Sequence, residues 1–244
     1  MEIRGRMDEE FELEDEGQAF KEYTYITSVI AVNYSLIADE LSNFGDFSAG
    51  LAIDLGTGLG DLAIEVGKRY PKLQVAGIDI SEKAIEEANK KAKAENLGNI
   101  NFRLADVHNL PFENNSVDLV VSHGAIHHLK DVSQAFLEIY RVLKPNAVAY
   151  ITDLRRDAPQ EVVKQVENNL PTSQAKGFIN SIRASYIPEE FKKILTDLGI
   201  NQFEVSGQRF SRNTIFKNKD KLRSVTTRSA DYTKLSQTIL IRKE

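Results

Sequence analysis

The 244-residue sequence contains no cysteine, which excludes disulfide bonds and thiol catalysis. It also lacks a Pro/Gly/Ser-rich linker, an internal repeat, a low-complexity tract and an apolar run long enough to cross a bilayer. The acidic stretch 1–17 has no apolar signal region, so we expect no export and a cytoplasmic location. With 41% hydrophobic residues the chain can bury a core, and we expect one domain over residues 1–244.

The charge balance gives little support to nucleic acid as the main partner, because the formal net charge is −5. One basic cluster late in the chain is the exception, and Asp220 is the only acid within it. The cluster is either a solvated loop or a patch for RNA or another anionic partner. Its members are Arg209, Arg212, Lys217, Lys219, Lys221, Arg223 and Arg228.

The most informative segment runs from Leu51 to Asp61, where an apolar strand enters three alternating glycines and then a helix. A second apolar strand, 74–79, ends on the carboxylate of Asp79. Glycines let the backbone approach a ligand closely, and an acid at a strand tip can accept hydrogen bonds from both hydroxyls of a ribose. The two features together predict a nucleoside site.

The charges around the glycine turn indicate which nucleoside binds. A dinucleotide fingerprint has G-x-G-x-x-G facing a pyrophosphate, but here Asp61 stands where the last glycine would be, and Asp54 adds a second acid. No lysine or arginine nearby is an obvious neutralising partner for these acids. We therefore expect a ligand whose non-nucleoside end is cationic, such as S-adenosylmethionine with its sulfonium and ammonium groups.

The segment from Leu51 to Asp157 resembles a class I S-adenosylmethionine-dependent methyltransferase of the small-molecule kind, similar to the domain found in ubiquinone and menaquinone biosynthesis. Five features occur in the family's order and spacing. They are the glycine turn, Asp79, the runs 104–107 and 110–112, the strand 117–122, and the segment 141–145. The sequence departs from the family at Asn146 and Ala147, where paired glycines are usual, and this concerns only a turn.

Apolar periodicity predicts alternating strands and helices, which is typical of an α/β doubly wound parallel sheet with helices on both faces. The resemblance implies a Rossmann-like, mostly parallel sheet of seven strands with a reversed final strand. The predicted helices are 18–43 (one or two), 60–69, one capped by Ser81 and ending before Gly98, 132–143, and several over 159–197 with Pro188 at a helix start. After the strand of the glycine turn, the predicted strands are 74–79, 100–104, 117–122, 147–153, 202–206 and 237–242.

These elements divide the chain into three parts. Residues 1–46 form an acidic, helical N-terminal cover, and residues 47–157 form the cofactor-binding core. Residues 158–244 form a helical lid, inserted after strand five, and the C-terminal strands.

The resemblance implies a set of cofactor contacts. Asp54, with the turn residues Gly56, Thr57, Gly58 and Gly60, meets the methionine portion, and Asp79 meets the ribose. Ile80 packs on the adenine, Asp106 and Val107 bind its edge, and Ser122 completes the site. Three alternatives stay open: Asp79 caps the next helix, although Ser81 can do so alone; Asp106 is a surface turn residue; and Ile80 belongs to the core.

Methyl transfer is an in-line displacement that requires alignment and, for some acceptors, removal of a proton. Three of the four histidines directly follow the fourth strand, and His123 and His127 are the candidate bases. His128 is a packing residue or an acceptor contact. His123 and His127 could also hold a metal with Asp131 or Asp153, but a third ligand is not evident and we expect no metal.

The fifth strand ends in dense charge, at Asp153, Arg155 and Arg156. Arginine forks bind carboxylate or phosphate, so these residues predict a small anionic acceptor, while pairing with Asp153, Asp157 or Glu161 is the alternative. Further candidates for the acceptor or the lid are Arg183, Tyr186, Tyr23, Tyr25 and Tyr34.

Three other functions compete with small-molecule methylation. The spacing of Tyr140 and Lys144 matches the Y-x-x-x-K of short-chain dehydrogenases, but Asp61 argues against a phosphate at the glycine turn. A non-catalytic adenosyl-ligand-binding protein and an RNA methyltransferase that uses the late basic cluster are the others. Nucleic-acid amino methylases often carry N/D-P-P-Y/F after the fourth strand, where this chain reads Ser-His-Gly-Ala at 122–125, so a small-molecule acceptor is favoured.

Overall fold

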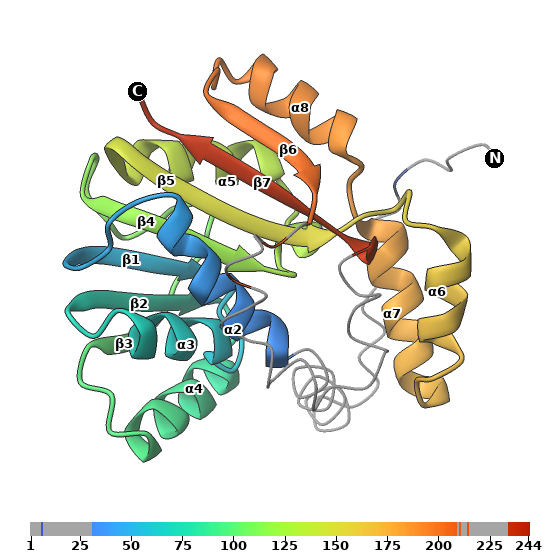
Figure 1. Ribbon diagram of the computed structural model, residues 1–244, viewed down its shortest axis with the longest axis horizontal. Helices are drawn as coiled ribbons and strands as arrows, with labels where there is room; N and C mark the ends of the chain where they lie inside the picture. The colour runs from blue at the N-terminus through green and yellow to red at the C-terminus, as the bar shows by residue number, and fades with distance from the viewer. Residues whose placement is uncertain (1–5, 7–30, 209, 211–213, 215–233) are drawn as a thin grey trace.

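A computed structural model describes residues 6, 31–208, 210, 214 and 234–244 of the chain (Figure 1). Its centre is a seven-stranded sheet of order β3-β2-β1-β4-β5-β7-β6. Strands β1 to β5 pair in parallel, while β7 lies antiparallel to both β5 and β6. The predicted doubly wound sheet with one reversed strand is confirmed. The strands are β1 Gly50–Leu55, β2 Leu73–Asp79, β3 Ile100–Leu104, β4 Val117–His123, β5 Leu143–Leu154, β6 Phe203–Gly207 and β7 Ser236–Arg242.

Helices cover both faces of the sheet (Figure 1). One apolar core lies between the sheet and α2, α3 and α4, and a second lies between the sheet and α5 and α8. Aliphatic side chains of the strands pack against the inward faces of the helices on both sides of the sheet. The burial of this apolar surface is the main term that stabilises such a fold. The helices are α2 Ala31–Glu40, α3 Asp61–Arg69, α4 Glu82–Ala94, α5 Val132–Val142, α6 Gln160–Glu167, α7 Thr172–Ala184 and α8 Pro188–Asp197.

Polar side chains fix the starts of two helices. The hydroxyl of Ser81 accepts a hydrogen bond from the Ala84 amide at 3.2 Å and caps α4, as predicted. The carboxylate of Asp131 accepts from the Gln134 amide at 2.9 Å and caps α5. Each cap satisfies an amide that has no partner inside its helix.

The helical insertion after strand five is confirmed. Helices α6 and α7 stand beyond the edge at which the parallel strands end, and they share a small apolar core of their own (Figure 1). That edge is where open α/β sheets bind their ligands. None of the helices within the described ranges combines the length and apolar character needed to cross a membrane.

The structure differs from the predicted elements at a few points. Strand β5 begins at Leu143, where it pairs with Val117 across a register shift, and not at 147. The three-residue helix η1 Leu41–Asn43 follows α2 within the predicted helical region 18–43. The three-residue helix η2 Ile126–His128 was not predicted, because three residues are too few for a periodic signal. Residues 18–30 of the predicted N-terminal helices and the seven residues of the late basic cluster lie outside the described residues.

Candidate active site

The glycine turn after β1 uses a backbone conformation that other residues rarely adopt. Gly56, Gly58 and Gly60 have φ angles of 62°, 52° and 79°. A Cβ atom on Gly56 would lie 2.5 Å from the Cβ of Ala125, in the turn after β4. The left-handed φ angles and this close approach both require glycine. The close approach brings the turn after β1 against the start of η2.

Asp79 at the tip of β2 joins the glycine turn to the start of α4. One carboxylate oxygen accepts from the Gly58 amide and the other from the Ser81 amide, each at 2.9 Å. Each carboxylate oxygen has two acceptor positions, so both oxygens can still accept from a ribose hydroxyl. Ser81 caps α4 through its own hydroxyl, which leaves Asp79 available for the predicted role.

Replacing Asp79 with alanine should weaken the binding of S-adenosylhomocysteine by about 1–3 kcal/mol, the range for lost hydrogen bonds to a charged group. Titration calorimetry measures the affinity. Ser81→Ala is the matched control, because it removes only the helix cap and should leave the affinity nearly unchanged. An Asp79→Ala variant with wild-type affinity would remove the ribose role.

Asp54 is buried beneath the turn, with 1% of its surface exposed. Its carboxylate accepts a hydrogen bond from the Thr57 hydroxyl at 2.6 Å. Burial raises the pKa of Asp54 to about 7; the bonds from Thr57 and the Ala63 amide oppose this shift, and Asp79 and Asp61 add to it. A nearby cation would favour the ionised form of this carboxyl.

The predicted absence of a neutralising cation was wrong for Asp61. Lys91 on α4 lies 2.9 Å from the Asp61 carboxylate and forms an ion pair with it. Thirty residues separate the two in sequence, and only the packing of α3 beside α4 brings them together. The preference of the turn for a cationic ligand therefore depends on Asp54 and Asp79 more than on Asp61.

The raised pKa of Asp54 predicts that cofactor affinity depends on pH. Below a pKa of about 7 the free carboxyl is protonated, so a cationic ligand that needs the carboxylate must displace a proton. The affinity for S-adenosylmethionine should rise between about pH 5.5 and 7.5, by up to about tenfold per unit at the acidic end. Calorimetry across this range measures the slope, and Asp54→Asn should flatten it. An equally steep slope in that variant would contradict the assignment to Asp54.

The adenine end of the site combines exposed apolar side chains with an oriented acid. Ile80 and Leu104 are 75% and 57% exposed, and Leu104 pairs with Asp79 in the β2–β3 register. Large apolar side chains so exposed at a sheet edge are suited to an adenine face. Asp106 accepts from the His108 amide at 2.9 Å and contacts the His108 ring at 2.6 Å, and these bonds lower its pKa.

Two predicted cofactor residues have structural partners. The hydroxyl of Ser122 is fully buried and donates to the Leu55 carbonyl at 2.9 Å, which joins β4 to β1. The side chain of Val107 belongs to the core, so only its backbone can meet a ligand.

His123 stands at the end of β4. Its Nδ1 lies 2.7 Å from the Thr152 hydroxyl, and its half-buried ring packs edge-on against Tyr34 of α2 at 5.4 Å between centroids. Burial lowers the pKa of His123 to about 4, against the raising effect of Asp153. The imidazole is therefore neutral near pH 7.

His127 is held more tightly than His123. One Asp153 oxygen contacts the Nδ1 of His127 at 2.6 Å, and the other accepts from the His127 amide at 2.8 Å. His127 is 3% exposed and Asp153 is 2% exposed. Burial opposes the ionisation of Asp153, but His127 and the Leu154 amide hold its pKa below the ordinary value. The pair fixes η2 to the end of β5.

The two histidines do not converge on a metal. His123 faces Thr152 and His127 faces Asp153, and Asp131 caps α5. In the described part of the chain, no three histidine, aspartate or glutamate side chains come close enough to hold an ion. His128 is exposed, and its ring lies 3.9 Å from that of His127 between centroids.

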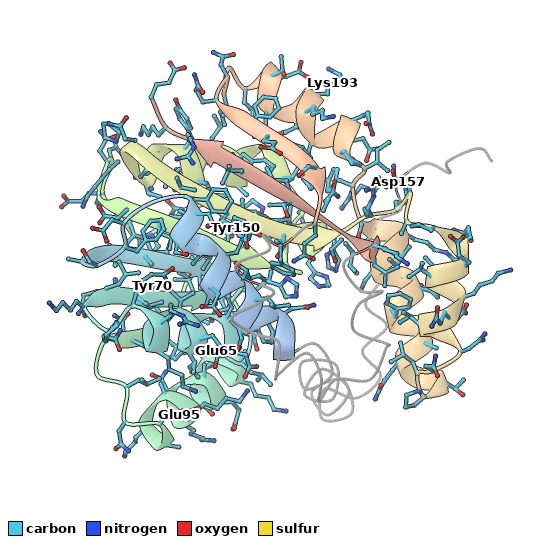
Figure 2. The ribbon with its side chains drawn as sticks, in the orientation of Figure 1. Glu65, Tyr70, Glu95, Tyr150, Asp157 and Lys193 are labelled. Atoms are coloured by element: carbon cyan, nitrogen blue, oxygen red, sulfur yellow. The ribbon has the colours of Figure 1, made fainter. Side chains whose placement is uncertain are left out.

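The arginines after β5 bind acceptors within the chain. Arg155 forms a two-pronged pair with Asp157, at 2.7 and 2.5 Å. Figure 2 shows Asp157 just beyond the end of β5. Arg156 donates to the Ser185 carbonyl and, at 2.6 Å, to Glu190. The alternative interpretation, that these arginines pair within the chain, holds for Arg155 and Asp157. Arg156 also pairs within the chain, but its partner Glu190 on α8 was not predicted.

Other predicted acceptor contacts are spread around the same edge. Arg183 is exposed on α7, and the half-buried Tyr186 packs on Phe191 of α8. Arg6 was not singled out in the sequence; it lies 4.5 Å from the centre of the Tyr186 ring and donates to the Ala184 carbonyl at 2.7 Å. An arginine in an acidic segment gives no sequence signal for such a contact. Tyr23 and Tyr25 lie outside the described residues.

The donor set of this edge fits an adenosyl sulfonium. The exposed apolar pair suits a base, Asp79 suits a ribose, and the buried carboxyl of Asp54 suits an ammonium group. S-adenosylmethionine supplies an electrophilic methyl group when it is bound here.

Comparison with known proteins identifies the family. A family model for methyltransferase domains matches residues 47–206. The ubiquinone/menaquinone biosynthesis C-methyltransferase of Desulfotalea psychrophila is 38% identical over 101 residues, which cover 41% of this chain and 40% of that protein. The 2-phytyl-1,4-naphtoquinone methyltransferase of a Nostoc species is 35% identical over 111 residues, which cover 45% and 48%. The matches thus span less than half the length of these curated relatives.

Solved structures share the fold. A crystal structure described as an S-adenosylmethionine-dependent methyltransferase from Methanococcus maripaludis matches with a TM-score of 0.68 and 25% identity, covering all of this chain and 96% of that one. The plantazolicin methyltransferase BpumL matches with a TM-score of 0.73 and 17% identity, over 94% and 92% of the two chains. The chain therefore belongs to the methyltransferase domain family, as a class I enzyme that uses S-adenosylmethionine.

Proposed function

We propose that the protein transfers the methyl group of S-adenosylmethionine to a small molecule by in-line displacement, with His123 accepting the proton that the acceptor loses. The observation that carries this proposal is the position of His123 at the tip of β4. Ala125, two residues later, meets the glycine turn at Gly56, so His123 lies beside the methionine portion of the expected cofactor.

The hydrogen bonds around His123 favour one tautomer. The Thr152 hydroxyl faces the Ser122 carbonyl at 3.4 Å, so it can donate there and accept from Nδ1 of His123. This arrangement assigns the ring proton to Nδ1 and leaves Nε2 as the proton acceptor. Since its pKa is about 4, the ring stays neutral near pH 7 and does not repel a sulfonium. His127, bound to Asp153, positions η2 and is not the base.

The relatives indicate the class of acceptor. Their names describe methylation of ubiquinone or menaquinone precursors and of a phytyl naphthoquinone. We infer that this chain also methylates a small molecule, with a hydroxylated ring as the first class to test. The internally paired Arg155 and Arg156 give an anionic acceptor less support than their sequence alone suggested.

We also propose that the three parts of the chain have different roles. Residues 1–46 cover the site, residues 47–157 bind the cofactor, and residues 158–244 form the lid and the C-terminal strands.

Replacing His123 with alanine should lower methyl transfer about 10²–10⁴-fold, the usual contribution of a general base. Affinity for S-adenosylhomocysteine should change less than about threefold, because the ring faces the acceptor. His123→Phe is the matched variant, since it keeps an aromatic ring beside Tyr34 but has no nitrogen. The methyl-transfer rates of the wild type and of both variants are measured with radiolabelled S-adenosylmethionine and a panel of hydroxylated rings.

Added imidazole should restore part of the turnover of the alanine variant, because it can occupy the vacated space and accept the proton. Equal losses of turnover and cofactor affinity would count against a base at this position. Binding of S-adenosylhomocysteine without turnover on any acceptor would favour the non-catalytic adenosyl-binding function.

A further inference from the structure

A row of polar side chains crosses the last four strands on the face that α2 covers. His123 pairs with Thr152, Thr152 pairs with Thr238, and Thr238 pairs with Ser206 in the strand registers. Directly paired residues project from the same face of a sheet, so these four side chains lie side by side. The neighbouring row on the same face, Val121, Tyr150 and Leu240, belongs to the apolar core or packs against it. The change from apolar to polar occurs at the ligand-binding edge.

Gln208 extends this row beyond the end of β6. It lies two residues after Ser206, on the same face of the sheet. Its backbone amide donates to the Ser236 carbonyl at 3.0 Å. The side chain is only 4% exposed, yet its Oε1 and Nε2 both lack a hydrogen-bond partner in the part of the chain that the structure describes. The Thr238 hydroxyl is also unsatisfied, because its approach to the Tyr150 phenol does not reach hydrogen-bond geometry.

Buried polar atoms almost always have a hydrogen-bond partner in the protein or in ordered water, so an unsatisfied one is unfavourable and can mark a functional site. Three such atoms occur here, two on Gln208 just after β6 and one on Thr238 of β7, at the edge where α/β sheets bind ligands. Polar side chains without partners among the described residues therefore indicate a binding role for this end of the row.

The charges near the row disfavour an anion. Arg155 and Arg156, at the end of β5, are bound to Asp157 and Glu190. Burial raises the pKa of Tyr150, next to the row, and the negative charge of Glu40 on α2 adds to this shift. Within the described residues the arginines at this edge are paired, so the amide and hydroxyl groups of the row favour neutral donors and acceptors over a buried carboxylate.

We propose that the row from His123 to Gln208 is the acceptor subsite, and that Gln208 determines specificity for a neutral acceptor bearing a carbonyl, amide or hydroxyl group. The inference rests on the proposed function, since His123 begins the row at the cofactor. The Gln208 amide would bind the acceptor at a distance from the methylated atom, and so would act on recognition and not on the chemistry.

Ligand-observed NMR titration of the protein saturated with S-adenosylhomocysteine tests this proposal. The probes are 4-hydroxybenzamide and 4-hydroxybenzoate, which have nearly the same shape and differ in charge. The wild type should bind the amide at least tenfold more tightly than the carboxylate. Gln208→Met should weaken amide binding about tenfold and leave S-adenosylhomocysteine affinity within twofold. Gln202→Met is the control, because Gln202 is exposed before the opposite end of β6.

Three results would overturn the proposal: tighter or equal binding of 4-hydroxybenzoate, unchanged amide binding in Gln208→Met, or no amide binding by the loaded wild type. Failure of the proposed function is a separate observation, because it shows as absent binding of S-adenosylhomocysteine or absent turnover.

Thermal unfolding of the ligand-free protein gives a second test that needs no acceptor. Methionine matches the length of glutamine without the unsatisfied amide, so Gln208→Met should raise the midpoint by about 2–4 °C. A lower midpoint would show that the amide has partners in the folded protein, and would overturn the proposal.

Discussion

Asp153→Ala is expected to lower the free energy of unfolding by about 3–5 kcal/mol, because it removes a buried carboxylate and leaves its hydrogen-bonding partners unsatisfied. The Asp153 carboxylate accepts from the His127 amide, the His127 ring and the Leu154 amide. Its removal leaves all three groups buried without their acceptor. Urea denaturation followed by circular dichroism measures the change. Because the pKa of Asp153 is lowered, its contribution is present at neutral pH and disappears in acid, below that pKa.

The matched control is Asp197→Ala on α8. Asp197 pairs with Lys193 at 2.5 Å, and the two side chains are 60% and 74% exposed. Figure 2 shows Lys193 on the outer side of the helix. An exposed pair of this kind contributes about 0.5 kcal/mol or less. If Asp153→Ala costs no more than this control, Asp153 does not anchor η2 as the structure indicates.

Gly56→Ala should lower the affinity for S-adenosylhomocysteine about 100-fold. An alanine at a φ of 62° is strained by about 1–2 kcal/mol, and its Cβ would lie 2.5 Å from that of Ala125. Carbon atoms in contact are about 3.5–4 Å apart, so the turn must move by about 1 Å. That movement displaces the turn relative to Asp79. Calorimetry measures the affinity, and circular dichroism checks that the variant is folded.

Gly98→Ala is the control for backbone flexibility. A Cβ on Gly98 would meet nothing within 4 Å, and its φ is outside the left-handed region. This variant should bind as the wild type does. A Gly56→Ala variant with wild-type affinity would mean that the turn does not form the cofactor site.

Local signals were enough to predict most of the fold. The apolar strands, the glycine turn and the Ser81 cap act within a few residues, and each lies where the periodicity placed it. The reversed strand β7 came from the family resemblance, since periodicity does not give strand direction. The longer β5 was missed because its start is set by pairing with Val117.

The site was less predictable, because its partners come from distant parts of the chain. The pair of Asp61 with Lys91 and that of Arg156 with Glu190 depend on helix packing. His123 and His127 looked equivalent in sequence, yet Thr152 and Asp153, adjacent on β5, give them different environments. Gln208 gave no signal, because its burial and its place in the polar row follow only from the β6–β7 register.

One calorimetric comparison tests the central claim, that the acid-lined glycine turn binds an adenosyl sulfur compound and not a diphosphate. The protein is titrated in parallel with S-adenosylmethionine, S-adenosylhomocysteine and NAD. We predict that both adenosyl ligands bind at least 100-fold more tightly than NAD. Tight binding of NAD, with no heat from either adenosyl ligand, would contradict the account.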